Sequence, residues 1–209
     1  MSTAAIQRTL IVVLIALLAA IGVVLVSRAG SVVSTRTTAS QAGPFLGPTF
    51  PAALRAGDFT LRDQRGRPVS LRQLHGRVVI LTFIHSRCKD ACPLMVEDIK
   101  GALNLMGRRA AGIAAVGISV QPAEDTVASR TAFMRRHGMN HRMAFLNGPR
   151  RALRAVWRAY AIQPVQGPVD HSTFVLLIDR RGYERVGWPA DQLTPEGLAH
   201  DLGVLQRGT

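Results

Sequence analysis

The chain has 209 residues, 47% of them hydrophobic, and a formal net charge of +13 at pH 7. This length and composition are enough for one ordinary domain with a packed core plus an appendage, so a single domain is expected. The charge comes almost wholly from arginine, and the arginines are scattered along the chain instead of clustering with aromatic residues. This distribution argues against a nucleic-acid-binding protein, although a cationic face would suit anionic lipid or an acidic partner.

After a short N-terminal segment, residues 1–9, an apolar run without any charge covers residues 10–26. As a helix rising ~1.5 Å per residue, this run spans ~25 Å, close to the short limit for crossing a bilayer. A cleaved signal peptide is the competing interpretation, with a small-x-small site at 27–29, but the apolar core of such a peptide usually has only ~7–15 residues. We therefore expect a retained transmembrane anchor.

The location of the protein follows from this anchor. Because nothing before Leu10 is long enough for a mitochondrial presequence, the sequence predicts a bacterial inner-membrane protein with its soluble domain in the periplasm. Residues 27–54 are rich in Ser, Thr, Ala and Gly and are interrupted by prolines, which is typical of a flexible linker.

The globular domain is predicted over residues 55–209. Alternating apolar and polar residues around a glycine turn at 59–71 predict a β-hairpin. Residues 78–84 are a continuous apolar run rich in β-branched side chains, typical of a strand buried on both faces in the middle of a sheet. Apolar residues recur at helical spacing after Pro93, which suits the first position of a helix. The remaining expected elements are a strand at 113–120, a helix at 123–137, a strand at 143–146, a helix at 150–160, a hairpin of strands at 174–178 and 183–188, and a last helix with Thr194 as its N-cap and Pro195 at its first position.

This order of elements predicts an α/β fold with a central mixed sheet, flanking helices and an N-terminal hairpin. The only two cysteines, Cys88 and Cys92, stand where the buried strand meets the start of a helix. A disulfide across so short a loop would restrict the unfolded chain little, so reactivity or metal binding explains the spacing better than stabilisation does. A helix N-terminus also lowers the pKa of a nearby thiol, which favours both metal ligation and thiol exchange.

Four segments of the sequence resemble the Sco/SenC family of membrane-tethered copper chaperones. They are FTLRDQRG at 59–66, TFIHSRCKDACP at 82–93, GISVQP at 117–122 and VDHSTFVLLIDRRG at 169–182. The resemblance implies a thioredoxin-like fold and a copper site formed by Cys88, Cys92 and His171. It also implies delivery to the copper site of a cytochrome oxidase subunit or exchange with another copper chaperone, which is a binding role more than an enzymatic one. Two thiolates and an imidazole suit Cu(I), and imidazole accepts Cu(II) as well.

Two positions depart from the usual pattern of that family. Members usually carry Pro directly after the first cysteine, where this chain has Lys89, and usually carry an Asp where this chain has Gln121. A lysine cation lowers the pKa of a thiol and repels a copper cation, which adds weight to thiol chemistry. A thiol–disulfide oxidoreductase with Cys88 and Cys92 as its redox-active pair is therefore the alternative function. A peroxidase is a weaker third, because peroxiredoxins usually carry Thr or Ser at the position held here by His85.

Other residues receive simpler interpretations. Asp170 is expected to orient the loop that carries His171 or to support that ligand. His85 suits a polar residue at the end of a strand better than an auxiliary ligand. Met95 is expected in the core, and the pair His137 and His141 is expected at a helix end and loop instead of forming a metal site. His75 and His200 are expected to be solvated.

Overall fold

The structure is a computed structural model and describes residues 43–51, 54–162 and 174–208. The predicted anchor at 10–26 lies outside these ranges, as does most of the predicted linker at 27–54. Within the described ranges, no helix is both long enough and apolar enough to cross a membrane. The structure therefore describes the predicted globular domain together with residues 43–51, which the sequence assigned to the flexible linker. That boundary was wrong, because the Phe50 N–H donates to Arg185 O at 3.0 Å and Thr49 forms a β-bridge with Val186, so this segment belongs to the domain.

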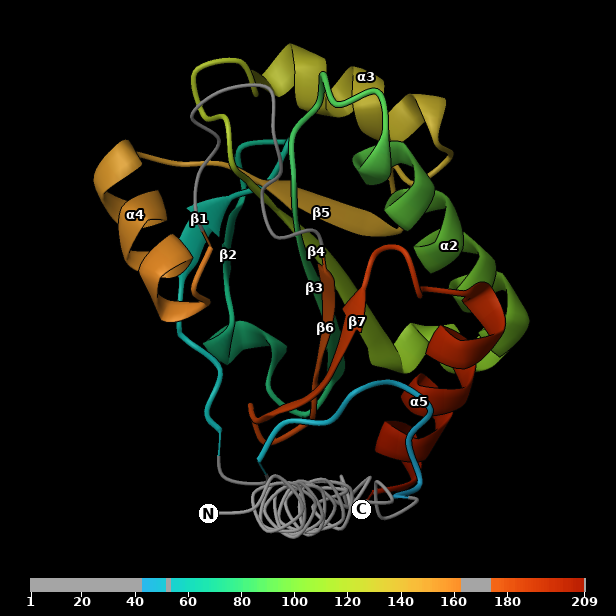
Figure 1. Cartoon of the computed structure of the whole chain (residues 1–209). Helices are drawn as coiled ribbons and strands as arrows, with labels where there is room; N and C mark the ends of the chain where they lie inside the picture. Colours follow the sequence, from blue (N-terminus) through green and yellow to red (C-terminus); the bar gives the residue numbers. More distant parts are fainter. Residues whose placement is uncertain (1–42, 52–53, 163–173, 209) are drawn as a thin grey trace, which may run out of the picture. The chain divides into compact units, whose positions relative to one another are not determined.

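A five-stranded mixed sheet, in the order β5–β4–β3–β6–β7, forms the centre of the domain (Figure 1). The central strand β3 (Val78–Ile84) pairs in parallel with β4 (Ile113–Ser119), which pairs in parallel with β5 (Met143–Leu146). On its other side β3 pairs antiparallel with β6 (Phe174–Ile178), and β6 pairs antiparallel with β7 (Glu184–Pro189). Because β3, β4 and β5 run in parallel, their C-terminal ends lie together at one end of the sheet and their N-terminal ends at the other.

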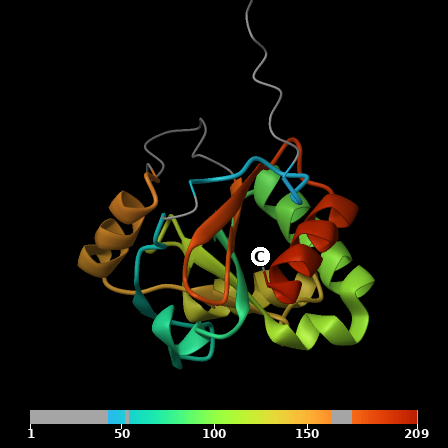
Figure 2. The same cartoon turned by 90° about the horizontal axis from the view of Figure 1, so that it is seen from below.

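Helices cover both faces of this sheet (Figures 1 and 2). α2 (Ala91–Met106) and α5 (Pro195–Arg207) pack on one face, and α4 (Arg150–Ala159) packs on the other. Alternate side chains of β3 point to opposite faces, so Ile80 joins the core under α2 and α5 whereas Leu81 joins the core under α4. The strand is buried throughout, which confirms the prediction drawn from its uninterrupted apolar run.

The predicted N-terminal hairpin is confirmed as β1 (Thr60–Arg62) paired antiparallel with β2 (Pro68–Ser70). Its turn reaches the edge strand β5 through the side chain of Gln64. The Gln64 Nε2 donates to Met143 O at 3.2 Å, and its Oε1 accepts from Phe145 N at 2.9 Å. The hairpin thereby satisfies backbone groups that an edge strand would otherwise present to other chains.

Two helices begin at residues other than those predicted. The helix expected from 123 is α3 (Val127–Arg136), because Thr126 Oγ1 accepts the Ser129 N–H at 3.1 Å and caps the helix there. α2 begins at Ala91, so Pro93 lies in its first turn instead of at its first position. The other strands and helices match the predicted bounds to within one residue, and Thr194 caps α5 as expected.

Candidate thiol and metal site

The two cysteines lie at the C-terminal end of the central strand. β3 ends at Ile84, a loop covers residues 85–90, and α2 begins at Ala91. Cys88 lies in the loop and is half-buried, whereas Cys92 lies in the first turn of the helix and is fully buried. A strand fixed in the core followed at once by a helix start holds this loop where α/β folds bind their ligands.

Both cysteines are free thiols. The Cys92 N–H donates to Cys88 Sγ at 3.4 Å, which uses one of the unpaired N–H groups at the start of α2. The Cys88 N–H in turn donates to His85 O at 3.2 Å, so the loop closes into a turn. The structure therefore brings the two predicted sulfur residues together and points a helix N–H at the more exposed one.

The two thiols differ in acidity. A hydrogen bond with the Cys92 side chain lowers the pKa of Cys88 to about 5, against the effect of burial. The N–H groups of Cys92 and Asp90 and the charge of His85 act in the same direction as that bond. The hydrogen bond with Cys88, together with burial, raises the pKa of Cys92. At neutral pH the pair therefore holds a thiolate on Cys88 and a proton on Cys92.

A buried carboxylate that the sequence analysis did not single out holds the cysteine loop in place. Asp125 is 0% exposed, and its Oδ1 accepts from the N and Oγ of Ser86 at 2.7 and 2.6 Å. Its Oδ2 accepts from Ser119 Oγ at 2.5 Å. Because Ser86 belongs to the loop and Ser119 ends β4, one side chain ties the loop to the sheet. The available signal was Thr126, whose N-cap chemistry leaves Asp125 outside the helix that was expected to contain it.

Four of the other histidines of the described ranges have polar contacts, namely His85, His137, His141 and His200, and His75 is exposed as predicted. His85 lies in the cysteine loop, and its Nδ1 accepts the Arg87 N–H at 3.3 Å. His137 is the C-cap of α3, which confirms the predicted helix end, and its Nδ1 lies 2.9 Å from Glu97 Oε1. His200 is exposed, as predicted, and its Nδ1 lies 3.0 Å from a carboxylate oxygen of the neighbouring Asp201. The predicted core position of Met95 is confirmed, since that side chain is 0% exposed.

His171 and Asp170 lie outside the described residues. Over the described ranges, no three side chains of His, Cys, Asp or Glu gather in a way that could hold a metal ion. The described part supplies the two sulfur atoms of the predicted site. It resumes at Phe174, whose carbonyl oxygen accepts from Thr82 Oγ1 at 2.9 Å, near the C-terminal end of β3.

The surface next to Cys88 carries charges of both signs, with Asp90 and Glu124 exposed beside Arg87 and Lys89, and an exposed apolar side chain. Lys89 and Arg87 are exposed, and the Arg87 Nε lies 3.8 Å from Glu124 Oε2. Leu94, two residues after Cys92, is 66% exposed although it belongs to the first turn of α2.

Comparison with known proteins identifies the family. The SCO1/SenC family model matches residues 48–204, a range that includes the sheet and both cysteines. The chain belongs to the SCO1/SenC family. SenC of Rhodobacter capsulatus is 30% identical over 161 residues, which cover 71% of this chain and 69% of that protein. The mitochondrial SCO2 homolog of Bos taurus is 28% identical over 163 residues, which cover 71% of this chain but only 60% of the bovine protein.

Solved structures of SCO1/SenC proteins share the fold. The structure of Bradyrhizobium japonicum ScoI with copper bound is 28% identical, has a TM-score of 0.65, and is matched over 73% of this chain and 99% of that one. The apo Sco1 protein of Thermus thermophilus has a TM-score of 0.66 at 23% identity, over 77% and 96% of the two chains. The predicted family and its mixed α/β, thioredoxin-like fold are thereby confirmed.

Proposed function

We propose that this protein is a copper metallochaperone that binds its cargo through Cys88, Cys92 and His171. Its recipient would be the copper site of a terminal cytochrome oxidase or another copper chaperone, as the family resemblance implies. The observation that carries the proposal is the pair of unoxidised sulfur atoms at the start of α2, of which Cys88 is already a thiolate. The likeness to ScoI of Bradyrhizobium japonicum, whose structure holds copper, supports the choice of metal.

The donor chemistry of the proposed site fits Cu(I). Soft thiolates select Cu(I), and an imidazole accepts either oxidation state of copper. Cys92 must lose its proton to become a ligand, so copper binding should release a proton and strengthen as pH rises. His171 precedes Phe174 by three residues, and a segment of that length spans at most about 10 Å. Chain length therefore supports a ligand near the end of β3, where Phe174 contacts Thr82.

Copper binding by the full, reduced chain tests the ligand set. We expect about one Cu(I) per chain, with an affinity at least about tenfold lower in His171→Ala and no retention in the double variant Cys88→Ser/Cys92→Ser. His200→Ala changes an exposed histidine of α5 and is the matched control. An affinity that His171→Ala leaves unchanged would contradict the proposed site.

The delivery role needs a test of its own. A strain that lacks the gene should lose copper and activity from its terminal oxidase, and the wild-type gene should restore both. The Cys88→Ser/Cys92→Ser gene should restore neither. An oxidase that keeps its copper in the deletion strain would refute delivery while leaving copper binding by the protein untouched.

We also propose that residues 10–26 remain as a single-pass anchor in a bacterial inner membrane, with the domain in the periplasm. The support is the uncharged apolar run itself. Alkaline carbonate washing of membranes should leave the full chain in the pellet, and protease added to spheroplasts should digest the domain. A mature protein that begins just after 27–29 would contradict a retained anchor.

The unequal acidity of the two thiols favours a second function, thiol–disulfide exchange. The Cys88 thiolate would attack a partner disulfide, form a mixed disulfide and release one partner thiolate. Cys92 would then lose its proton and attack Cys88 Sγ, which forms the Cys88–Cys92 disulfide and releases the second partner thiolate. Two electrons pass to the partner, so an external dithiol reductant must restore the pair.

Trapping and alkylation test this second function. Cys92→Ser should accumulate a mixed disulfide with partner proteins, and Cys88→Ser is the control that should not. Alkylation of Cys88 by iodoacetamide should rise with pH around a midpoint near 5, the pKa of that thiol. The midpoint should move toward the ordinary thiol pKa in Cys92→Ala, because the side-chain hydrogen bond that lowers the pKa of Cys88 most is then lost. Absence of any trapped adduct would contradict the exchange function.

A further inference from the structure

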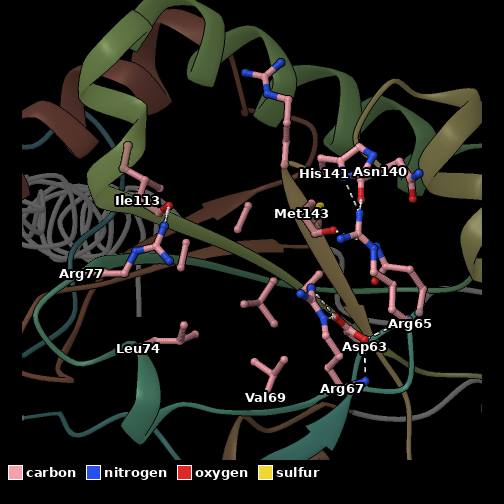
Figure 3. Close-up of a pocket in the computed structure, with 16 residues that line it drawn as sticks. Asp63, Arg65, Arg67, Val69, Leu74, Arg77, Ile113, Asn140, His141 and Met143 are labelled. Atoms are coloured by element: carbon pink, nitrogen blue, oxygen red, sulfur yellow. Dashed lines mark hydrogen bonds and ion pairs between the residues drawn. The ribbon is translucent and has the colours of Figure 1, made fainter.

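A polar pocket of about 250 Å³ lies at the end of the sheet opposite the cysteines (Figure 3). The first residues of β4 and β5 form its floor, and its walls come from the hairpin turn at 63–67, from Arg77 just before β3, and from the turn at 140–142. β3 has seven residues between the two ends. At about 3.3 Å per residue, the pocket therefore lies roughly 20 Å from the cysteine loop.

Arginines dominate the charge of this pocket. Arg65, Arg67, Arg77 and Arg142 line it, and Asp63 is the only acidic residue among the described residues around it. Arg67 pairs with Asp63, since its Nε and its Nη2 both lie 2.9 Å from Asp63 Oδ2. That ion pair is neutral as a unit, so the charge of the other three arginines remains.

Those arginines bind groups that carry no net charge. Arg65 Nη2 donates to Asn140 O at 2.9 Å and also contacts His141 Nδ1. Arg77 Nη2 donates to Ala111 O at 3.4 Å and to Ile113 O. Over the described part of the chain, neither Arg65, Arg77 nor Arg142 has a carboxylate at ion-pair distance. Figure 3 shows Arg77 on one side of the pocket and Arg65 on the other, with the strands between them. The pocket therefore presents fixed and uncompensated positive charge from two sides.

We propose that this pocket binds the phosphate group of a small anion. A guanidinium offers five N–H donors in a planar fork. The bonds of Arg65 and Arg77 use Nη2, so the Nε–H and both Nη1–H groups of each remain available for phosphate oxygens. The carbonyl bonds hold the forks of Arg65 and Arg77 in place before a ligand arrives, which lowers the entropy lost on binding. Arginine suits this role better than lysine because its donors lie in one plane in fixed directions and so orient the phosphate.

The volume of the pocket and its apolar wall limit which phosphate compounds can bind. A volume of about 250 Å³ is below the ~300–1,000 Å³ of pockets that bury drug-sized ligands, so it admits a phosphate with a small substituent. Val69 and Leu74 give one wall an apolar surface on which the organic part of a phosphate ester can rest. The same chemistry occurs in a free phosphate compound and in the headgroup of a phosphate-bearing lipid.

Calorimetric titration of the full chain in a neutral detergent tests the proposal. Sodium pyrophosphate represents a free phosphate compound, and dihexanoyl phosphatidic acid below its micelle concentration represents a lipid headgroup. Saturable binding of either titrant supports the site. The titrant that binds more tightly shows whether the natural ligand is a free phosphate compound or a lipid headgroup. Absence of saturable binding by both would overturn the proposal.

Matched double variants locate the binding. Arg65→Ala/Arg77→Ala should weaken the binding of the tighter titrant at least about tenfold. Arg151→Ala/Arg154→Ala removes the same charge from the exposed side of α4 and should change it by less than about twofold. Equal weakening by both double variants would show general charge attraction and overturn the site.

A charge-conserving variant guards against a folding defect, because Arg77 also holds the start of β4. Arg65→Lys/Arg77→Lys keeps both charges but removes both forks, so it should bind several-fold more weakly than wild type and more tightly than the alanine variant. Thermal unfolding without ligand shows which variants are folded. If the folded lysine variant binds the titrant as tightly as wild type does, the planar guanidinium groups are not required for binding, which contradicts the proposal. All these residues lie away from the cysteines, so a negative result leaves the copper proposal standing.

Discussion

The two ends of the central sheet are organised by buried carboxylates with different partners. At the cysteine end, Asp125 is 0% exposed, and neutral donors of Ser86 and Ser119 bind its oxygens. At the opposite end, Asp63 is 1% exposed and accepts from the backbone N–H and the guanidinium of Arg67. The side chain of Arg67 is itself 66% exposed, so water reaches the charge that balances Asp63.

This difference shows how one set of strands serves two kinds of site. Hydroxyl and amide donors in a dry interior bind in one geometry only, which fixes the loop that carries Cys88. A solvated guanidinium neutralises a carboxylate but leaves its neighbours open to water. The loop at the cysteine end is therefore held in one position. The pocket at the opposite end is open to solvent and is lined by arginines that have no carboxylate partner among the described residues.

The largest effect is expected from Asp125→Ala. The substitution leaves the Ser86 N–H and the Ser119 hydroxyl buried without an acceptor, and each such group costs about 1–3 kcal/mol. We expect the free energy of unfolding to fall by about 3 kcal/mol, measured by urea denaturation at pH 7. Asp191→Ala, at an exposed position, is the control and should stay within about 0.5 kcal/mol of wild type. A loss below about 1 kcal/mol for Asp125→Ala would show that the loop is held by other contacts.

The fold could be predicted because each helix and strand has a local sequence pattern. The hydrogen bonds of buried polar side chains such as Asp125 could not be predicted in this way. The apolar run of β3 and the Thr194 cap are signals within a few residues of sequence. Asp125 binds Ser86, which lies 39 residues before it in the sequence. The periodic pattern of a single helix or strand carries no information about such a contact. The low pKa of Cys88 was expected from the helix start alone, but the structure adds a larger cause, the hydrogen bond with the Cys92 thiol.

The site shows the same division between local and distant information. Cys88 and Cys92 were identifiable because they stand beside a strong strand and a helix start. The arginine pocket was not, because it assembles from a hairpin turn, the residue before β3 and the starts of two further strands. Scattered in sequence, those arginines gave no reason to expect one site.

A smaller loss in the free energy of unfolding is expected from Asp63→Ala than from Asp125→Ala. Burial opposes ionisation of Asp63, but bonds from the backbone of Arg67 and Arg65 and from the Arg67 side chain outweigh it and lower the pKa. Because water can replace the exposed guanidinium, we expect a loss of about 1.5 kcal/mol at pH 7, roughly half that of Asp125→Ala. A lowered pKa gives stability that is present above the unfolded value, 3.8, and lost as pH falls through the folded value. The difference from wild type in urea should therefore shrink at pH 3, and an unchanged difference would contradict this account.

Glu184 shows what happens to a buried carboxylate without partners. Its side chain has no hydrogen bond or ion pair among the described residues, and burial raises its pKa to about 7. A raised pKa in an acid destabilises the fold at high pH, and the penalty grows as pH rises from about 4.5 to about 7. Glu184→Gln should therefore stabilise the protein by on the order of 1 kcal/mol at pH 8 and leave it unchanged at pH 4. Glu196→Gln, at an exposed position, is the control, and equal effects at both pH values would contradict the prediction.

The smallest effect is expected from the exposed cation beside Cys88. Lys89→Gln removes a charge that repels bound copper, but solvent and salt screen an exposed side chain, so Cu(I) affinity should rise by no more than about threefold. The gain should vanish in 1 M salt, where the screening length is about 3 Å. Lys89→Pro tests stiffness separately: a gain that persists in high salt would come from a more rigid loop and not from charge. A gain above about tenfold in Lys89→Gln would show instead that the lysine acts directly on the copper site.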